Sequence, residues 1–195
     1  MKRETRGLLL IAVAAALVGT VAAFIVEGPG PLLRTEAGQR AFNAVIQRDA
    51  PEGLAIARRG QPMPIPKVWT LAGERIDLPV PKRRPLLINV WASWCGPCVE
   101  EMPELQRYAR AQGGDGVQVV GLALDTAEGV RDFLARVPVD YPIVLETPGP
   151  ADASVWLGNT RGLLPYSVLV DAQGKVVKQK LGPFAHGEIE AWARH

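Results

Sequence analysis

From residue 61 onward, short apolar runs alternate with stretches of helical periodicity. Residues 86–91 and 117–124 are almost entirely apolar, as expected of strands that are buried on both faces of a sheet. Each run is followed by a segment in which apolar residues recur at helical spacing, 99–111 and 127–136. This order of strand, helix, strand and helix predicts an α/β domain.

Shorter patterns predict the remaining elements of the domain. Residues 67–78 predict a small hairpin that turns at Ala72-Gly73, and residues 171–174 have the composition of a hairpin turn. The other predicted elements are strands at 142–145, 166–170 and 175–181 and helices at 151–157 and 187–194. The complete order predicts a central mixed sheet covered by helices on both faces.

The first part of the chain has a different pattern. Residues 8–26 contain no charged residue and follow a basic segment, 1–7. At 1.5 Å per residue, this stretch spans about 28 Å, which is close to the thickness of the hydrocarbon core of a bilayer. We expect a transmembrane anchor whose basic flank stays in the cytoplasm, so that the rest of the chain lies outside the membrane. A cleaved signal peptide is the alternative, because Ala22 and Ala23 are small enough to permit cleavage.

The sequence therefore predicts four parts: a cytoplasmic basic segment (1–7), a transmembrane anchor (8–26), a linker (27–60) and a globular domain (61–195). Within the linker, Thr35 is a candidate N-cap for a short helix over 36–48. Residues 1–26 hold three of the 22 basic and one of the 20 acidic residues, so 19 of each remain. This neutral balance argues against nucleic acid as a partner.

The chain has only two cysteines, Cys95 and Cys98, and they lie where strand 86–91 runs into helix 99–111. Backbone N–H groups and the helix dipole at a helix start stabilise a thiolate, which favours Cys95 as a nucleophile. The spacing of three residues places both sulfurs on one helix face, close enough to form and break a disulfide. A redox-active pair explains both the spacing and the position.

Two other interpretations of the cysteines explain less. A structural zinc site usually needs four Cys or His ligands, and the only histidines, His186 and His195, lie near the far end of the chain. A purely structural disulfide that closes so short a loop removes little entropy from the unfolded chain. We therefore expect neither a metal nor another cofactor. In the oxidising compartment of an exported protein, a reductant must regenerate the dithiol.

Three motifs resemble the TlpA and ResA branch of membrane-anchored thioredoxins. They are Asn-Val-Trp-Ala-Ser-Trp-Cys-Gly-Pro-Cys at 89–98, Glu-Met-Pro-Glu-Leu at 101–105, and Leu-Leu-Pro at 163–165 with Val-Leu-Val-Asp at 168–171 and Gly174. The resemblance covers about 61–195. It implies a thioredoxin-like fold and an extracytoplasmic thiol–disulfide oxidoreductase, in most members a reductase. For this chain we expect a place in the bacterial inner membrane, with the catalytic domain in the periplasm and a membrane thiol–disulfide electron donor.

We expect Cys95 to attack a client disulfide and Cys98 to resolve the mixed disulfide. The resemblance implies that Pro165 is a cis-proline facing the active-site disulfide and that Leu164 pairs its backbone with an extended substrate segment. The residues expected to contact substrate are Trp94, Gly96, Pro97, Leu164 and Pro165.

Two roles stay open for Glu101, which lies one helical turn after Cys98. In the ResA-like branch, a glutamate at this position assists proton movement, and such a carboxylate could accept the proton of Cys98. The alternative is a solvated glutamate in an acidic first turn shared with Glu100 and Glu104. Asn89 occupies the position where thioredoxins proper carry a buried aspartate.

The function predicted on this basis is reduction of disulfides in periplasmic client proteins through a mixed-disulfide intermediate. One alternative is a reductase dedicated to apocytochrome c in cytochrome c maturation, and a second is an oxidant that introduces disulfides. A non-enzymatic module that uses the groove at Pro165 to hold peptides, as a chaperone does, is an alternative of another class.

Overall fold

The computed structural model describes residues 53–194 together with 35, 37–39, 41 and 51. The predicted basic segment 1–7 and membrane anchor 8–26 lie outside these residues. Among the residues that are described, no helix is both long and apolar enough to cross a membrane. The chain divides into two compact units, residues 1–45 and 46–195, and the second contains both cysteines.

In the first unit, residues 37–39 and 41 are helical. The backbone N–H of Gly38 donates to Thr35 Oγ1 at 3.0 Å, which is the hydrogen bond of an N-cap. The predicted capping role of Thr35 is therefore confirmed. The remaining positions of the predicted helix 36–48 lie outside the described residues.

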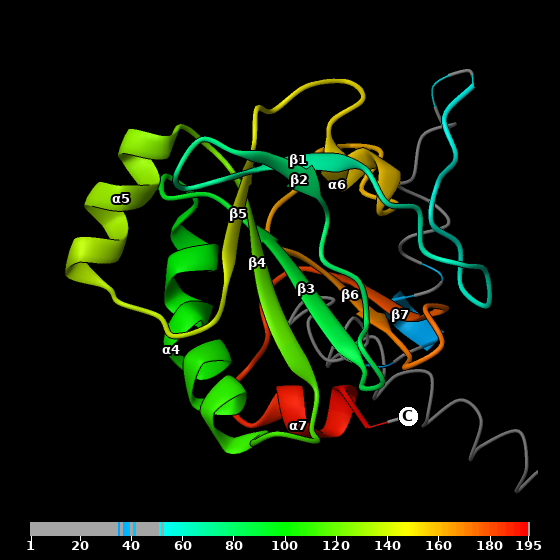
Figure 1. Cartoon of the computed structure of the whole chain (residues 1–195). Coiled ribbons are helices and arrows are strands. Elements are labelled where there is room, and N and C mark those ends of the chain that lie inside the picture. Colours follow the sequence, from blue (N-terminus) through cyan, green and yellow to red (C-terminus); the bar gives the residue numbers. More distant parts are fainter. Residues whose placement is uncertain (1–34, 36, 40, 42–50, 52, 195) are drawn as a thin grey trace, which may run out of the picture. The chain divides into compact units, whose positions relative to one another are not determined.

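Within residues 53–194, seven strands form one mixed sheet in the order β2-β1-β5-β4-β3-β6-β7 (Figure 1). Strand β3 pairs in parallel with β4 and antiparallel with β6, while β1 and β2 form the predicted hairpin at one edge. The strands are β1 (Lys67–Thr70), β2 (Arg75–Asp77), β3 (Leu86–Trp91), β4 (Gln118–Leu124), β5 (Ile143–Glu146), β6 (Tyr166–Val170) and β7 (Val176–Leu181).

Helices cover both faces of the sheet, as predicted. Three of them contribute apolar side chains to the core that contains both cysteines: α4 (Gly96–Ala111), α5 (Ala127–Arg136) and α7 (Glu188–Trp192). The short helix α6 (Ala153–Trp156) contributes to the core on the opposite face. Figure 1 shows α4 running beside the sheet with α7 near its C-terminal end.

The predicted bounds hold for β3, α5 and β6, and the other elements differ for local reasons. Helix α4 begins at Gly96 instead of residue 99, because the side chain of Cys95 caps it and Pro97 needs no hydrogen-bond acceptor in the first turn. Helix α6 begins at Ala153 because Asp152 caps its first turn, and Gly158, with a φ of 103°, follows its C-cap, Leu157. Helix α7 begins at Glu188 because Gly187 has a φ of 74° and stays outside the helix.

The end of the predicted linker packs on the domain. The backbone N–H of Ala57 donates to the carbonyl of Trp156 at 2.7 Å, and that of Gly60 donates to the carbonyl of Val176 at 2.8 Å. Ala57 is buried in the same core as α6. Residues 57–60 therefore belong to the compact structure, a few residues before the boundary that the sequence predicts.

Alternating residues of β3 face opposite sides of the sheet. Leu87 and Trp91 belong to the core beneath α4, so Asn89 between them also faces α4. Asn89 lies opposite Ser167 on β6, and Ser167 lies opposite Lys180 on β7. All three are buried, and they form a polar row across the sheet beneath α4.

Candidate active site

Cys95 and Cys98 form a disulfide at the start of α4, with their Cα atoms 5.3 Å apart. Cys95 lies in the loop that follows β3 and is the N-cap of α4, and Cys98 lies in the first turn. Cys95 keeps an exposed fraction of 7%, whereas Cys98 is completely buried. Of the two sulfur-bearing residues, Cys95 is thus the more accessible one, and the predicted order of attack and resolution stays a prediction.

The start of α4 is suited to stabilise a Cys95 thiolate. The backbone N–H of Cys98 points at Cys95 Sγ, with 3.3 Å between nitrogen and sulfur. Backbone N–H groups of a first helical turn lack partners within the helix, and the dipole favours negative charge there. Such surroundings lower a thiol pKa and raise the fraction of nucleophilic thiolate near neutral pH.

The residues expected to contact substrate lie at the same end of the sheet as the disulfide. Trp94 is 67% exposed, and Gly96 and Pro97 are exposed beside it. The Leu164–Pro165 peptide bond is cis, as the resemblance implies, and Pro165 precedes β6, which pairs with the end of β3. The side chain of Leu164 packs against the core that contains both cysteines.

Asn159 holds the loop that leads to Pro165, and the sequence analysis did not identify it. Its Nδ2 donates to the carbonyl of Leu163, and its Oδ1 accepts the N–H of Leu163, each at 3.0 Å. Asn159 is buried, while the side chain of Leu163 is 43% exposed. The loop therefore presents an apolar side chain next to the cis-proline on a fixed backbone.

Asp125 fixes the loop before Cys95, and it was also missed. Its Oδ2 accepts both the backbone N–H of Ser93 at 2.8 Å and the hydroxyl of Ser93 at 2.6 Å. Its Oδ1 accepts the N–H of Thr126 at 2.7 Å. Asp125 follows β4, the parallel neighbour of β3, so both strands end beside the active site. A polar residue directly after a buried parallel strand is the signal that could have identified it.

Glu101 is buried, with an exposed fraction of 2%, so the alternative of a solvated glutamate is wrong. Its Oε1 accepts Asn89 Nδ2, and its Oε2 accepts the backbone N–H of Phe184, each at 2.8 Å. Burial raises the pKa of Glu101 to about 7, and Glu188 adds to this, while the two hydrogen bonds and Lys180 oppose it.

The predicted acidic first turn is a second error. Helix α4 begins at Gly96, so its first turn, residues 96–99, contains no acidic residue. Glu104 lies further along and binds Arg107, with 2.6 Å between Oε1 and Nη2, and the N–H of Gly187 at 2.7 Å. These contacts hold the pKa of Glu104 down at about 2. Glu104 therefore ties α4 to the start of α7 and remains ionised.

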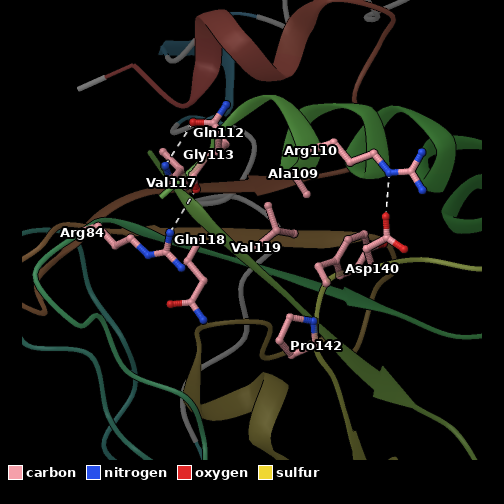
Figure 2. A pocket seen from close by; sticks show the side chains of 11 residues that line it. Arg84, Ala109, Arg110, Gln112, Gly113, Val117, Gln118, Val119, Asp140 and Pro142 are labelled. Atoms are coloured by element: carbon pink, nitrogen blue, oxygen red, sulfur yellow. Dashed lines mark hydrogen bonds and ion pairs between the residues drawn. The ribbon is translucent and has the colours of Figure 1, made fainter. Parts of the chain in front are cut away.

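A surface pocket of about 250 Å³ lies at the opposite end of the sheet, near the end of α4 and the beginnings of β4 and β5 (Figure 2). Arg84 Nη1 donates to the carbonyl of Gly114 at 2.7 Å, and Arg110 pairs with Asp140 at 2.6 Å. None of the predicted site residues lines this pocket. The charged side chains that line this pocket are already hydrogen-bonded or ion-paired. The pocket contributes no residue to the dithiol site.

A disulfide at the start of the helix that follows β3, with a cis-proline directly before the neighbouring strand β6, defines a thioredoxin-fold thiol–disulfide oxidoreductase. Residues 58–192 match the sequence profile of the Redoxin family. The chain belongs to this family and, within it, is a thiol–disulfide oxidoreductase of the ResA and StoA type.

Individual relatives agree with this assignment. Over 147 residues, the chain is 31% identical to the sporulation thiol-disulfide oxidoreductase A of Bacillus subtilis (strain 168), covering 72% of this chain and 86% of that protein. Over 128 residues, it is 27% identical to the thiol-disulfide oxidoreductase ResA of Bacillus anthracis, covering 65% and 72%. The crystal structure of StoA from Bacillus subtilis superimposes with a TM-score of 0.54 at 27% identity, covering 68% and 98%.

Proposed function

We propose that the protein is an extracytoplasmic reductase that passes two electrons to disulfides of client proteins. In this proposal, residues 8–26 anchor it in the bacterial inner membrane, and the catalytic domain faces the periplasm. The apolar stretch and its basic flank support the location. The observation that carries the reaction is the arrangement of the two cysteines, in which Cys95 caps α4 and Cys98 is buried behind it.

The reaction starts from the dithiol form. The Cys95 thiolate attacks one sulfur of the client disulfide, a mixed disulfide forms, and the other client sulfur leaves as a thiolate. Cys98 then loses its proton and attacks Cys95 Sγ. The Cys95–Cys98 disulfide forms, and the second client sulfur leaves as a thiolate. Two electrons have passed to the client, whose thiolates take up two protons.

Glu101 is the group that we propose to take the proton of Cys98. It lies one turn along α4 on the same buried face. With a pKa of about 7, its carboxyl can both accept and release a proton near neutral pH. Cys98 is completely buried, so a nearby internal base avoids the need for bulk water in the resolving step.

The client is proposed to bind over an apolar surface beside the disulfide, formed by the exposed Trp94 and Leu163 and the half-buried Leu164. An extended client segment would pair with the backbone of Leu164 next to Pro165. A membrane thiol–disulfide donor is proposed to return the protein to the dithiol form, because the periplasm is oxidising.

The experiment that tests the reaction is a trapping assay. Cys98→Ser should accumulate mixed disulfides with periplasmic proteins on a nonreducing gel, because the resolving thiol is missing. Cys95→Ser is the matched control and should accumulate none. Equal trapping by both variants would contradict the assigned roles. Mass spectrometry of the trapped proteins identifies the clients, and apocytochrome c alone would indicate a dedicated reductase.

The direction of electron flow is tested by the reduction potential of the Cys95–Cys98 pair in defined thiol buffers. A potential near or below about −230 mV supports a reductase, whereas one near about −120 mV would identify an oxidant. The binding alternative is tested with the double variant Cys95→Ser, Cys98→Ser. Full activity of that variant in protecting unfolded clients would replace the enzymatic proposal with a chaperone role.

A further inference from the structure

Lys180 is a lysine in the protein core. It lies on β7 with an exposed fraction of 3%, and its Nζ is 3.0 Å from Glu188 Oε1 on α7. The side chain of Glu188 is 16% exposed. Removing two charges from water costs more than a single ion pair usually returns, so a buried pair is weak evidence for a role in stability. The burial of this ion pair therefore points to a functional effect on a neighbouring group.

Lys180 belongs to the polar row beneath α4, and this row contacts Glu101. Across the sheet, Asn89, Ser167 and Lys180 occupy neighbouring positions on β3, β6 and β7. Asn89 Nδ2 donates to Glu101 Oε1 at 2.8 Å and to Ser167 Oγ at 3.1 Å. One end of the row therefore contacts Glu101, and the other end carries the positive charge of Lys180.

The segment between β7 and α7 makes a second connection. Glu101 Oε2 accepts the backbone N–H of Phe184 at 2.8 Å, and Glu188 Oε2 accepts that of Ala185 at 2.7 Å. Lys180 Nζ lies 5.4 Å from the centre of the Phe184 ring. Two carboxyl groups thus hold two consecutive N–H groups, and the ammonium group of Lys180 lies against the same segment.

We propose that Lys180 and Glu188 are positioning residues for Glu101, and that their opposite charges together set the pH at which its carboxyl exchanges a proton with Cys98. This inference rests on the proposed function for the role of Glu101 in the resolving step. The effect on Glu101 itself does not depend on that role.

The charged and titratable groups around Glu101 lie on α4, β7 and α7 and just before β5. Lys180 on β7 favours its ionised form, and Glu188 on α7 disfavours it. Tyr141, just before β5, stays neutral because burial and the charge of Glu101 both raise its pKa. Cys98 lies on the same helix as Glu101. The two hydrogen-bond donors, Asn89 and the backbone of Phe184, are neutral.

The proposal predicts shifts of opposite sign. Lys180→Met removes a positive charge and should raise the pKa of Glu101, whereas Glu188→Gln removes a negative charge and should lower it, each by about one unit. Lys180→Arg keeps the positive charge, so the titration midpoint of the Glu101 carboxyl should stay at its wild-type value. The measurement is a ¹³C carboxyl NMR titration of the oxidised full-length protein in detergent micelles, and Glu101→Gln assigns the resonance by its loss.

A merely structural ion pair predicts a different result. Loosened packing would admit water in both variants, so the midpoint of Glu101 would fall in both. Shifts in the same direction, or no shift in either variant, would overturn the proposal. If Lys180→Met does not fold, Lys180→Gln removes the same charge with a polar side chain and decides instead: a raised midpoint of Glu101 supports the proposal, and an unchanged or lowered one contradicts it.

A second readout separates this inference from the proposed function. The pH dependence of the rate at which the dithiol form reduces a disulfide-containing client should move with the midpoint of Glu101 in each variant. If the midpoints move in opposite directions but the rate profile stays fixed, the positioning role is supported and proton transfer through Glu101 is wrong. If neither moves, the positioning role itself is wrong.

Discussion

The side-chain amide of Asn89 donates a hydrogen bond of 2.8 Å to the carboxyl of Glu101, and both residues are almost completely buried. Asn89 belongs to the strand that leads to the disulfide, and Glu101 belongs to the helix that begins with it. Where thioredoxins proper carry a carboxyl on the strand, this chain has an amide, and its buried carboxyl lies on the helix. The buried carboxyl therefore lies on α4 instead of on the strand, one helical turn after Cys98.

The burial of Glu101 predicts that stability falls as the pH rises. Its pKa is about 7 in the folded protein and about 4.5 in the unfolded chain. Below pH 4.5 both states are protonated; between 4.5 and 7 only the unfolded chain releases the proton, so the free energy of unfolding falls. The decrease is on the order of 3 kcal/mol. Chemical denaturation of the oxidised protein across this range measures it.

Glu101→Gln should remove this pH dependence, because the glutamine stays neutral. The hydrogen bonds can be kept: Asn89 Oδ1 has no partner among the described residues, so a rotated amide can accept from the new side chain. The exposed neighbour Glu100 provides the matched control, Glu100→Gln, which should leave the slope as it is. A slope that persists in Glu101→Gln would show that another group causes it.

Asp125 is predicted to matter for the rate because it fixes the loop before Cys95. Asp125→Ala removes the oxygen that accepts from both donors of Ser93 and should lower the free energy of unfolding by about 2 kcal/mol. The rate of client reduction should fall about tenfold, since the attacking sulfur is no longer held in place. Asp132→Asn, at an exposed position of α5, is the control for loss of an acidic residue. An unchanged rate with reduced stability would limit Asp125 to a structural role.

The exposed Trp94 should affect protein clients more than small disulfides. Trp94→Ala is expected to raise KM for a protein client about tenfold, because large aromatic side chains contribute strongly to binding surfaces. The effect on a small-molecule disulfide should be much weaker. Trp69→Ala is the matched control, since Trp69 is 38% exposed on β1, which β5 and β4 separate from β3 in the sheet. Equal losses for both substrates in Trp94→Ala would indicate a damaged site instead of a lost contact.

Local sequence patterns were sufficient to predict the helices and strands and to identify the cysteine pair. The bounds of β3, α5 and β6 follow from apolar runs and helical spacing, and the helix start makes Cys95 the outer sulfur. Local patterns were not sufficient to predict the burial of Glu101, which in the sequence looks like one of several acidic residues on a surface helix. Its burial depends on Phe184, which lies 83 residues away in sequence.

The other residues that the sequence analysis missed depend on similar contacts. Asp125 reaches Ser93 across 32 residues of sequence, because parallel strands bring the two loops together. Lys180 looks like a solvated residue of a polar edge strand, and only its register with Ser167 and its packing against α7 place it inside. Such contacts depend on strand order and helix docking, which no periodicity in the sequence specifies.

Placing a second carboxyl beside Glu101 tests whether the ionisation of Glu101 controls the pH dependence of client reduction. Asn89→Asp would put two carboxyl groups about one hydrogen bond apart, in place of the 2.8 Å amide contact. Two such groups cannot both ionise, so the pair should keep one proton well above pH 7. The pH profile for client reduction should move upward by more than one unit. Ser167→Ala removes the other hydrogen bond of Asn89 without adding charge, and its profile should stay in place. An unmoved profile in Asn89→Asp would mean that the ionisation of Glu101 does not limit the reaction.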